Sequence, residues 1–288
     1  MIRRLKYNEI DFDKYTHCLE NSEQKNGYAR KEVLDQLSGN WHILVKDDYQ
    51  AVMPIHIKRK MGIDFVHMPL FCQQLGIFSK TDDPGINGAF LNFLKKKYKV
   101  FLYSFNDRNR FDDDLEKRKN YIIPVSDYAI LRRKKYFKGR KSTVKMAQHL
   151  LYNEIDLNAD SLEFIKNNFK GLAKEAEWQQ LKNYLIFLAE NNSLKLCGAF
   201  SGNILINLAL LIADQKQLSL LGLVNNENFK HENGSSFLID RILQQYVGYQ
   251  SFNFMGSNIR GIEVFFKSFG ADLRDYNFIE NKFLKRFI

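Results

Sequence analysis

The stretch Leu194–Val224, LKLCGAFSGNILINLALLIADQKQLSLLGLV, decides the fold. Two apolar runs, Leu194–Phe200 and Asn203–Ile212, are joined by Ser201-Gly202. A short turn of this kind between two apolar runs predicts a β-hairpin. The run Gln217–Val224 follows and predicts a third strand, so we expect a β-sheet at the centre of this part of the chain.

Helical patterns flank these strands. Before them, Ser161–Gly171 and Glu177–Glu190 carry apolar residues three or four positions apart, which predicts two helices. After them come the loop Asn225–Gly234, a helical pattern from Ser235 to Val247, and a strand pattern, Ser251–Met255. The predicted order is therefore helix, helix, hairpin, strand, glycine-bearing loop, helix and strand.

The first part of the chain reads as a shorter series of the same kind. Trp41–Val45 and Gln50–Ile57 predict two strands joined by a charged turn, and Asp64–Met68 predicts a third. Gly88–Tyr98 has apolar residues at helical spacing and leads into an alternating strand pattern, Lys99–Phe105. We therefore expect a weak internal duplication.

Length and composition agree with two folded domains. The chain has 288 residues, of which 45% are hydrophobic and 26% are charged. At about 150 residues per domain, this length favours two domains or one large domain over a single small module, and the composition argues against a disordered or fibrous chain. We expect an N-terminal domain over residues 1–125 and a C-terminal domain over residues 126–288.

Cysteine and histidine spacing exclude several classes of site. Cys18, Cys72 and Cys197 form no CxxC pair, and the six histidines show no HxH or HExxH spacing. The sequence therefore predicts neither a disulfide framework nor a metal site. The apolar stretch Ile204–Ala213 is interrupted by Asn207 and is too short to cross a bilayer. We expect a soluble, cytoplasmic protein, and the oligomeric state stays open.

The second series ends with a glycine turn and a lysine segment. Phe252–Asn258 is followed by Gly261 and then by Phe265–Ala271, FFKSFGA. In the first series, Met68–Gly76 reads MPLFCQQLG. Together with the order of elements, these segments resemble tandem-GNAT acyltransferases of the FemAB/FemX type, which include the BioF2-like domain. The resemblance implies an α+β fold with two GNAT-like domains in tandem, each a mixed central sheet flanked by helices.

The resemblance also implies an activity. Enzymes of this type move an acyl or aminoacyl group from acyl-CoA or aminoacyl-tRNA to an amine, and a cell-wall precursor is one candidate acceptor. We expect no tightly bound cofactor and direct attack of the amine on the donor carbonyl. Lys267 and backbone amides near Leu221–Val224 would then stabilise the oxyanion. The general base is unassigned, with Tyr246, Tyr249 and Glu263 as candidates.

Lys267 is the candidate catalytic residue. In FemX-like enzymes the matching lysine lies in the active cleft and contacts the substrate. The alternative is a surface lysine on a helix whose buried face is formed by Phe265, Phe266 and Phe269. The resemblance further implies five substrate-binding residues: Phe71, Gln73, Gln74, Ser257 and Asn258.

The loop before the last long helix is the candidate donor site. Glycine allows close backbone approach, serine caps the helix, and the free amides suit a pyrophosphate. The segment lacks the full Q/R-x-x-G-x-G/A pattern of acyl-CoA enzymes, and an ordinary capped helix is the alternative. The candidate cofactor-binding residues are Lys230, His231, Asn233, Gly234, Ser235 and Ser236.

Positive charge is concentrated in one segment. The formal net charge is +10, and Arg132–Lys145 contains eight cationic residues and no acidic one. Such a segment predicts salt-sensitive binding of nucleic acid, a phospholipid headgroup or a nucleotide-sugar diphosphate, while a solvated charged helix is the alternative. The candidate polyanion-binding residues are Arg132, Arg133, Lys134, Lys135, Lys138, Arg140 and Lys141.

Two other functions compete with aminoacyl transfer. One is a catalytically inactive tandem-GNAT module that binds RNA or another polyanion through Arg132–Lys145, with tRNA as a candidate partner. The other is a conventional acyl-CoA N-acetyltransferase with a small amine acceptor. Salt-dependent tRNA binding would favour the first and stabilisation by CoA the second.

Overall fold

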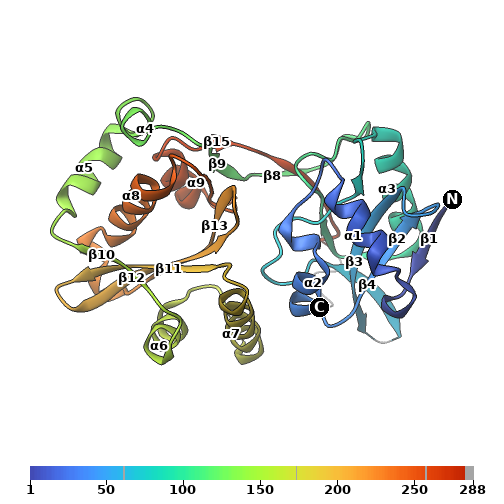
Figure 1. Ribbon diagram of the computed structural model, residues 1–288, viewed down its shortest axis with the longest axis horizontal. Coiled ribbons are helices and arrows are strands. Elements are labelled where there is room, and N and C mark those ends of the chain that lie inside the picture. The colour runs from blue at the N-terminus through green and yellow to red at the C-terminus, as the bar shows by residue number, and fades with distance from the viewer. Residues whose placement is uncertain (61, 173, 257, 283–288) are drawn as a thin grey trace. The chain divides into compact units, whose positions relative to one another are not determined.

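The computed structural model describes residues 1–60, 62–172, 174–256 and 258–282, which form two compact units. Unit 1 comprises Met1–Arg118 and the described residues from Asp275 onward, and unit 2 comprises Lys119–Arg274. The chain therefore passes from one unit to the other twice. Figure 1 shows the elements of both units.

Unit 1 contains a six-stranded and a three-stranded sheet. The larger sheet has the order β1-β2-β3-β4-β6, with β5 paired to β3, and the smaller has the order β7-β16-β8. The strands are β1 (Ile2–Leu5), β2 (Trp41–Lys46), β3 (Ala51–Lys60), β4 (Ile63–His67), β5 (Phe78–Ser79), β6 (Lys99–Val100), β7 (Leu102–Ser104), β8 (Lys117–Arg118) and β16 (Tyr276–Glu280). The helices are α1 (Phe12–Glu20), α2 (Lys31–Leu37) and α3 (Pro84–Lys97), with 3-10 turns η1 (Tyr7–Glu9) and η2 (Gly27–Ala29).

The predicted hairpin of unit 1 is confirmed by β2 and β3, which pair antiparallel from Trp41↔His56 to Lys46↔Ala51. The expected strand Lys99–Phe105 is instead split into β6 and β7. β6 pairs parallel with β4, whereas β7 pairs antiparallel with β16. The residues predicted as one strand therefore belong to two sheets, because the partner strand changes at Phe101.

Unit 2 is built on a seven-stranded sheet of order β10-β11-β12-β13-β14-β9-β15. Its strands are β9 (Tyr121–Ile123), β10 (Leu151–Ile155), β11 (Leu194–Ser201), β12 (Ile204–Ala213), β13 (Gln217–Asn225), β14 (Ser251–Asn253) and β15 (Asp272–Leu273). Its helices are α4 (Tyr128–Lys134), α5 (Lys138–Met146), α6 (Ala159–Asn168), α7 (Glu175–Glu190), α8 (Gly234–Tyr246) and α9 (Arg260–Lys267), with the 3-10 turn η3 (Glu227–Glu232). The sheet is mixed, since β13 and β14 are parallel while β11, β12 and β13 are antiparallel neighbours.

Helices cover both faces of this sheet. α6 and α7 lie on one face, α8 and α9 lie on the other, and α5 packs outside α8 (Figure 1). The core on the α8 side joins buried residues of the sheet, such as Cys197 and Leu218, to Phe237 of α8 and Phe269 after α9. In the part of the chain that the structure describes, no helix combines the length and apolar character needed to cross a bilayer.

The predicted elements of unit 2 are confirmed. The two helical patterns form α6 and α7, the hairpin forms β11 and β12, and the third strand and the helix after it form β13 and α8. Two short strands complete the sheets from unexpected places in the sequence. β9 precedes the expected boundary at residue 125 yet pairs with β14 of unit 2, and β16 lies well beyond that boundary, at Tyr276–Glu280, yet pairs with β7 of unit 1.

Candidate functional site

β13 carries a bulge in the middle of the unit 2 sheet. Leu210 of β12 pairs with Gly222, whereas the next residue, Leu211, pairs with Leu220. Leu221 is therefore left without a partner in the register. A bulge of this kind bends its strand and changes the direction of the residues that follow, so the second half of β13 diverges from the regular sheet.

The same half of β13 also loses its other neighbour. β13 and β14 are paired only over Gln217–Ser219 and Ser251–Asn253. Within the described residues, Leu220–Asn225 has no partner strand on the β14 side. This edge carries backbone N–H groups that are free to face a ligand, and such donors stabilise negative charge on a carbonyl oxygen under attack.

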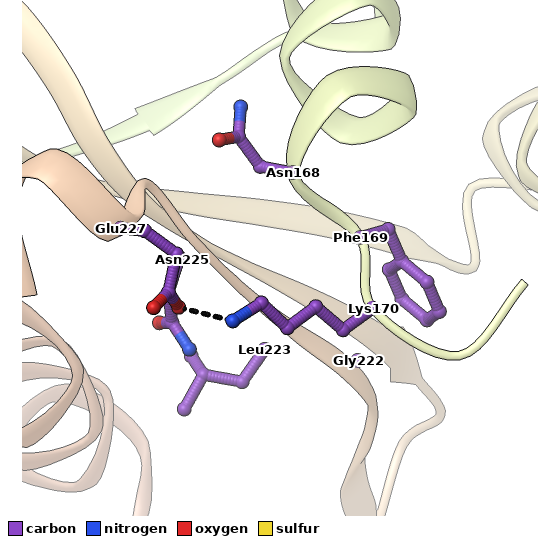
Figure 2. Close-up of a pocket in the computed structure, with 7 residues that line it drawn as sticks. All are labelled: Asn168, Phe169, Lys170, Gly222, Leu223, Asn225 and Glu227. Atoms are coloured by element: carbon purple, nitrogen blue, oxygen red, sulfur yellow. Dashed lines mark ion pairs between the residues drawn. The ribbon is translucent and has the colours of Figure 1, made fainter.

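A pocket of about 220 Å³ lies beside this edge (Figure 2). It lies between the end of α6 and the second half of β13, and its lining residues are Asn168, Phe169, Lys170, Gly222, Leu223, Asn225 and Glu227. The Phe169 ring lies against Gly222, where a Cβ atom would come 2.5 Å from Phe169 Cε2. Glycine is therefore needed in the strand to admit the aromatic wall of the pocket.

One rim of the pocket is charged. Lys170 Nζ lies 2.6 Å from Glu227 Oε1, and both side chains are exposed. Figure 2 shows the two side chains reaching toward one another across the opening. The pocket thus combines an aromatic wall with an exchangeable ion pair, an arrangement that suits a small polar group such as an amine.

Asn225 connects the pocket to the first turn of α8. Its Oδ1 accepts hydrogen bonds from Asn207 Nδ2 at 2.5 Å and from Ser235 Oγ at 2.7 Å. Asn207 is the one polar residue of the apolar strand β12 and is buried. These bonds fasten the start of α8 to β12 and β13 at the level where the β13–β14 ladder has ended.

The start of α8 shows why position 234 is a glycine and corrects one part of the sequence analysis. A Cβ atom on Gly234 would lie 1.7 Å from Asn207 Oδ1, so the glycine allows the Asn207 side chain to approach the helix closely. The predicted serine cap is wrong, because Asn233 occupies the N-cap with φ +61° and no side-chain cap bond. Ser235 and Ser236 follow the N-cap, and their hydroxyls bond Asn225 and Arg140 instead.

The remaining candidate donor residues lie in η3, directly before α8. Lys230 and His231 are exposed, and His231 Nε2 lies 3.4 Å from Glu232 Oε1. The helix dipole and the amides of the first turn favour an anion at this end of α8. The binding of a donor phosphate here stays a prediction.

Lys267 belongs to a cluster of four side chains, Lys119, Tyr121, Glu263 and Lys267, which we call the Lys267 cluster. Glu263 Oε1 accepts from Lys267 Nζ at 2.6 Å and from Tyr121 Oη at 2.8 Å, and Glu263 Oε2 accepts from Lys119 Nζ at 2.9 Å. The Glu263 side chain is 13% exposed, whereas that of Lys267 is 43% exposed. The two ammonium groups and one carboxylate leave a net positive charge facing solvent.

The Lys267 cluster lies near the end of β14, where the pairing between β13 and β14 stops. Phe254, the residue after β14, donates its backbone N–H to the carbonyl of Tyr121 at 2.9 Å. Tyr121 therefore marks the end of β14. The predicted substrate residue Asn258 is also close, since its Oδ1 accepts from the backbone N–H of Lys119 at 3.1 Å. The structure thus brings Lys267 and Asn258 together through Lys119.

Phe269 and Gly270, which follow Lys267 in the sequence, have structural roles. Phe269 is fully buried, and Gly270 has φ +79° with a Cβ position only 2.4 Å from Lys135 Cβ. The phenylalanine and the glycine therefore hold the end of α9 in place, and the lysine is the member of the motif that faces solvent. The predicted substrate residue Ser257 lies outside the described residues.

Neither of two candidate bases is suited to accept a proton at neutral pH. Hydrogen bonds from Lys267, Lys119 and Tyr121 lower the pKa of Glu263 to about 2. Burial, together with a hydrogen bond to Glu154, raises the pKa of Tyr246 to about 12. Tyr249 is exposed and lies near Tyr246, with 5.9 Å between ring centroids. A covalent cysteine is equally disfavoured, since burial raises the pKa of Cys197 to about 12.

The candidate substrate residues of unit 1 are tied into that unit. Gln74 is buried, and its Oε1 accepts from the backbone N–H of Asp107 at 2.9 Å. Phe71 is half-buried with φ +66°. Gln73 is half-buried, and its side chain lies at hydrogen-bonding range of Tyr276.

Several of the candidate polyanion residues are engaged within unit 2. Arg140 donates to Ser268 Oγ at 2.8 Å and to Ser236 Oγ, and it stacks on Phe265 and Phe269. Lys141 Nζ donates to the carbonyl of Arg133 at 2.7 Å, and Lys135 pairs with Asp272 at 3.2 Å.

The positive charge of Arg132 stabilises the carboxylate of a buried residue, Asp240. Burial raises the pKa of Asp240, and the charge of Arg132 opposes that rise. Four of the seven predicted residues, Arg132, Lys135, Arg140 and Lys141, therefore have roles in the fold. Arg133, Lys134 and Lys138 are exposed.

The sequence pointed to only part of this site. A glycine within the β13 pattern, Gly222, and a polar residue within the β12 pattern, Asn207, are the local signals that mark a bulge or a close approach. The pocket residues Asn168 and Lys170 carry no such signal, because their place beside β13 depends on how α6 packs on the sheet.

Comparison with known proteins gives structural matches only. No protein-family model and no curated protein matches the sequence. The structure of FemX matches with a TM-score of 0.63 and 11% identity, covering 99% of each chain. A tandem GNAT protein from the clavulanic acid biosynthesis pathway matches with a TM-score of 0.58 and 8% identity, covering 96% of this chain and 97% of that one. L-PGS from Bacillus licheniformis matches with a TM-score of 0.54 and 13% identity, covering 95% and 92%.

These likenesses establish the fold. The chain has the tandem-GNAT fold seen in FemX, so the predicted α+β class, with mixed sheets flanked by helices in two GNAT-like domains, is confirmed. The bulged strand β13, its short pairing with β14 and the start of α8 are features of its second unit.

Proposed function

We propose that this protein is an acyltransferase that moves an acyl or aminoacyl group from an activated donor to a primary amine. The observation that carries the proposal is the open edge of β13, where a bulge at Leu221 and the early end of the β14 ladder expose backbone donors beside a pocket. The tandem-GNAT fold shared with FemX supports it.

The chemical step is a direct substitution at the donor carbonyl. The amine nitrogen attacks the carbonyl carbon, a C–N bond forms, and the C–S bond of a thioester or the C–O bond of an aminoacyl ester breaks. The thiol or the tRNA hydroxyl leaves, and the amine loses a proton to solvent. Backbone N–H groups of Leu221–Val224 stabilise the oxyanion, and no covalent enzyme intermediate is needed.

Lys267 supplies positive charge near the open edge. Its hydrogen bond to Glu263 orients the ammonium group, and the second ammonium of Lys119 keeps the cluster positive overall. Preorganised charge of this kind lowers the energy of a transition state that gains negative charge. In this proposal Lys267 contacts the donor carbonyl oxygen or a carboxylate of the substrate.

Donor and acceptor approach β13 from different elements. The first turn of α8, with Gly234 and Ser235 fastened to Asn207 and Asn225, is the place for a donor phosphate. The pocket at Phe169 and Lys170 is the place for the acceptor amine. An acyl-CoA and an aminoacyl-tRNA both carry phosphate, so both are candidate donors in this proposal.

Thermal denaturation tests whether a donor binds. We expect acetyl-CoA or an aminoacyl-tRNA to raise the Tm, because a ligand that binds only the folded state stabilises it. Pantetheine is the matched control for CoA, since it keeps the thiol arm and lacks the pyrophosphate, and uncharged tRNA is the control for the ester. No rise in Tm with either donor at concentrations up to millimolar would overturn the proposal.

A further inference from the structure

α4 and α5 form the outer layer of unit 2, on the side of α8 away from the sheet (Figure 1). Their inner faces hold them there. Leu131 of α4 and Val144 of α5 are buried, and Arg140 reaches inward to Ser236 and Ser268. The hydrogen bond from Lys141 to the carbonyl of Arg133 ties the two helices to each other. The pair is therefore a fixed surface.

The outer faces of both helices combine cations with large apolar side chains. On α4, Ile130, Arg133 and Lys134 are three and four positions apart, so they share one exposed face. On α5, Lys138, Lys145 and Met146 are seven and eight positions apart and share another. Phe137 lies between the helices and is also exposed.

The cations of this surface are free to bind a partner. Among the described residues, no carboxylate lies within ion-pair distance of Arg133, Lys134, Lys138 or Lys145, in contrast to Lys135, which pairs with Asp272. The sequence from Tyr128 to Asn153 contains no acidic residue. The four free cations thus form an uncompensated positive surface.

The exposed apolar side chains of this surface favour a bilayer over a nucleic acid as its partner. Ile130, Phe137 and Met146 are 50%, 52% and 62% exposed, although they stand among charged neighbours. A nucleic acid would use the four cations and the Phe137 ring, but Ile130 and Met146 offer no aromatic face on which a base stacks. An anionic bilayer uses both kinds of side chain, since the cations pair with headgroup phosphates while the apolar side chains enter the interface.

We infer that the outer face of α4 and α5 binds the surface of a bilayer that contains anionic phospholipid. The contact is peripheral and reversible, because three apolar side chains and four cations bury little area compared with a spanning helix. This inference is independent of the proposed acyl transfer.

Vesicle flotation tests the charge. The full-length protein is mixed with vesicles of phosphatidylglycerol and phosphatidylcholine, or of phosphatidylcholine alone, at low and high salt. We expect binding to the anionic vesicles only. Neutralising all four cations, as Arg133→Gln, Lys134→Gln, Lys138→Gln and Lys145→Gln, is expected to weaken binding on the order of 1,000-fold. The matched control neutralises four exposed lysines of unit 1, as Lys95→Gln, Lys96→Gln, Lys97→Gln and Lys99→Gln, and retains binding.

A tryptophan placed at position 137 tests insertion. Trp41 and Trp178 are 1% and 7% exposed and give a constant background. We expect the emission of Phe137→Trp to shift to the blue with anionic vesicles and to be quenched by brominated lipid. We also expect the variant with Ile130→Gln and Met146→Gln to lose the part of vesicle binding that remains at high salt. Equal melting temperatures of the variants and the wild type establish that each is folded.

Three results would overturn the inference. One is the absence of binding to anionic vesicles at low salt. Another is binding without any change in the emission of Phe137→Trp. The third is tRNA binding that depends on the four cations while vesicle binding does not, which would assign the surface to RNA.

Discussion

Glu263 is the residue on which the Lys267 cluster depends. Its carboxylate receives hydrogen bonds from Lys267, Lys119 and Tyr121, which lower its pKa to about 2 from an ordinary value of 4.5. The stabilisation is therefore complete above the ordinary value and is lost as the pH falls toward 2. We predict that Glu263→Gln lowers the free energy of unfolding at pH 7 and that the difference from the wild type shrinks at pH 3.

Urea unfolding at the two pH values measures this difference. Glu163→Gln is the control, because Glu163 is exposed on α6, and its effect is expected to be small at both pH values. A penalty for Glu263→Gln that is as large at pH 3 as at pH 7 would contradict the assigned ion pairs.

Gly234 is the second residue with a sharp consequence. An added Cβ would lie 1.7 Å from Asn207 Oδ1, so we predict that Gly234→Ala destabilises the protein by about 1–3 kcal/mol. Asn207→Ala removes the clash, so the double variant is expected to be more stable than the sum of the two single effects. Strict additivity in thermal or urea unfolding would show that the close approach is absent.

Residue patterns in the sequence anticipate only contacts that are local in the chain. Lys267 and Glu263 are four positions apart on α9, so their pairing follows from helical spacing. Lys119 and Tyr121 reach the same carboxylate from more than 140 positions away, and no local pattern indicates that. The serine hydroxyls near the start of α8 likewise bond Asn225 and Arg140, which lie 10 and 96 positions away, and the local cap pattern does not indicate these partners.

At the scale of elements, α5 is attached through Arg140. Its guanidinium is half-buried, bonded to two serines and stacked on two phenylalanines, and burial lowers its pKa. We predict that Arg140→Ala costs about 2 kcal/mol or more, because packing and hydrogen bonds are both lost. Lys138→Ala, on the exposed face of the same helix, is the control and is expected to change stability by less than about 0.5 kcal/mol.

Chemical unfolding of the two variants distinguishes a structural arginine from a surface cation. Equal and small effects would place Arg140 in solvent with its neighbours, and the basic segment would then act as one charged surface.

Element prediction succeeded where apolar periodicity is long. α7, β11, β12 and β13 span 8–16 residues each and were predicted with nearly correct bounds. The short strand β14 was predicted within Ser251–Met255, whereas β9 and β15 were missed, because their pairing partners lie far along the chain. The bulge at Leu221 was missed for the same reason, since only the register with β12 reveals it.

At the scale of the whole molecule, the first and the last described segments of the chain both belong to unit 1. β16 returns to unit 1 after unit 2 is complete, so unit 1 contains segments from both ends of the sequence. A domain order read along the sequence does not show such a return. The order of elements in unit 2 nevertheless identified the GNAT architecture that the comparison with FemX establishes.

In the proposed reaction, unit 2 transfers an acyl group with the help of Lys267. Lys195 provides the control, because it also pairs with a glutamate, Glu154, and lies over a tyrosine ring, that of Tyr246. Its pair resembles that of Lys267 with Glu263 and Tyr121. Removing Lys195 is therefore expected to disturb the protein in a similar way without touching the proposed site.

The most direct measurement follows label from ¹⁴C-acetyl-CoA or a ¹⁴C-aminoacyl-tRNA to a peptide that carries a primary amine. We predict transfer from one of the two donors by the wild type and by Lys195→Ala, and a rate lower by about 100-fold or more for Lys267→Ala. Transfer by Lys267→Ala at the wild-type rate, or no transfer by the wild type from either donor, would contradict this prediction.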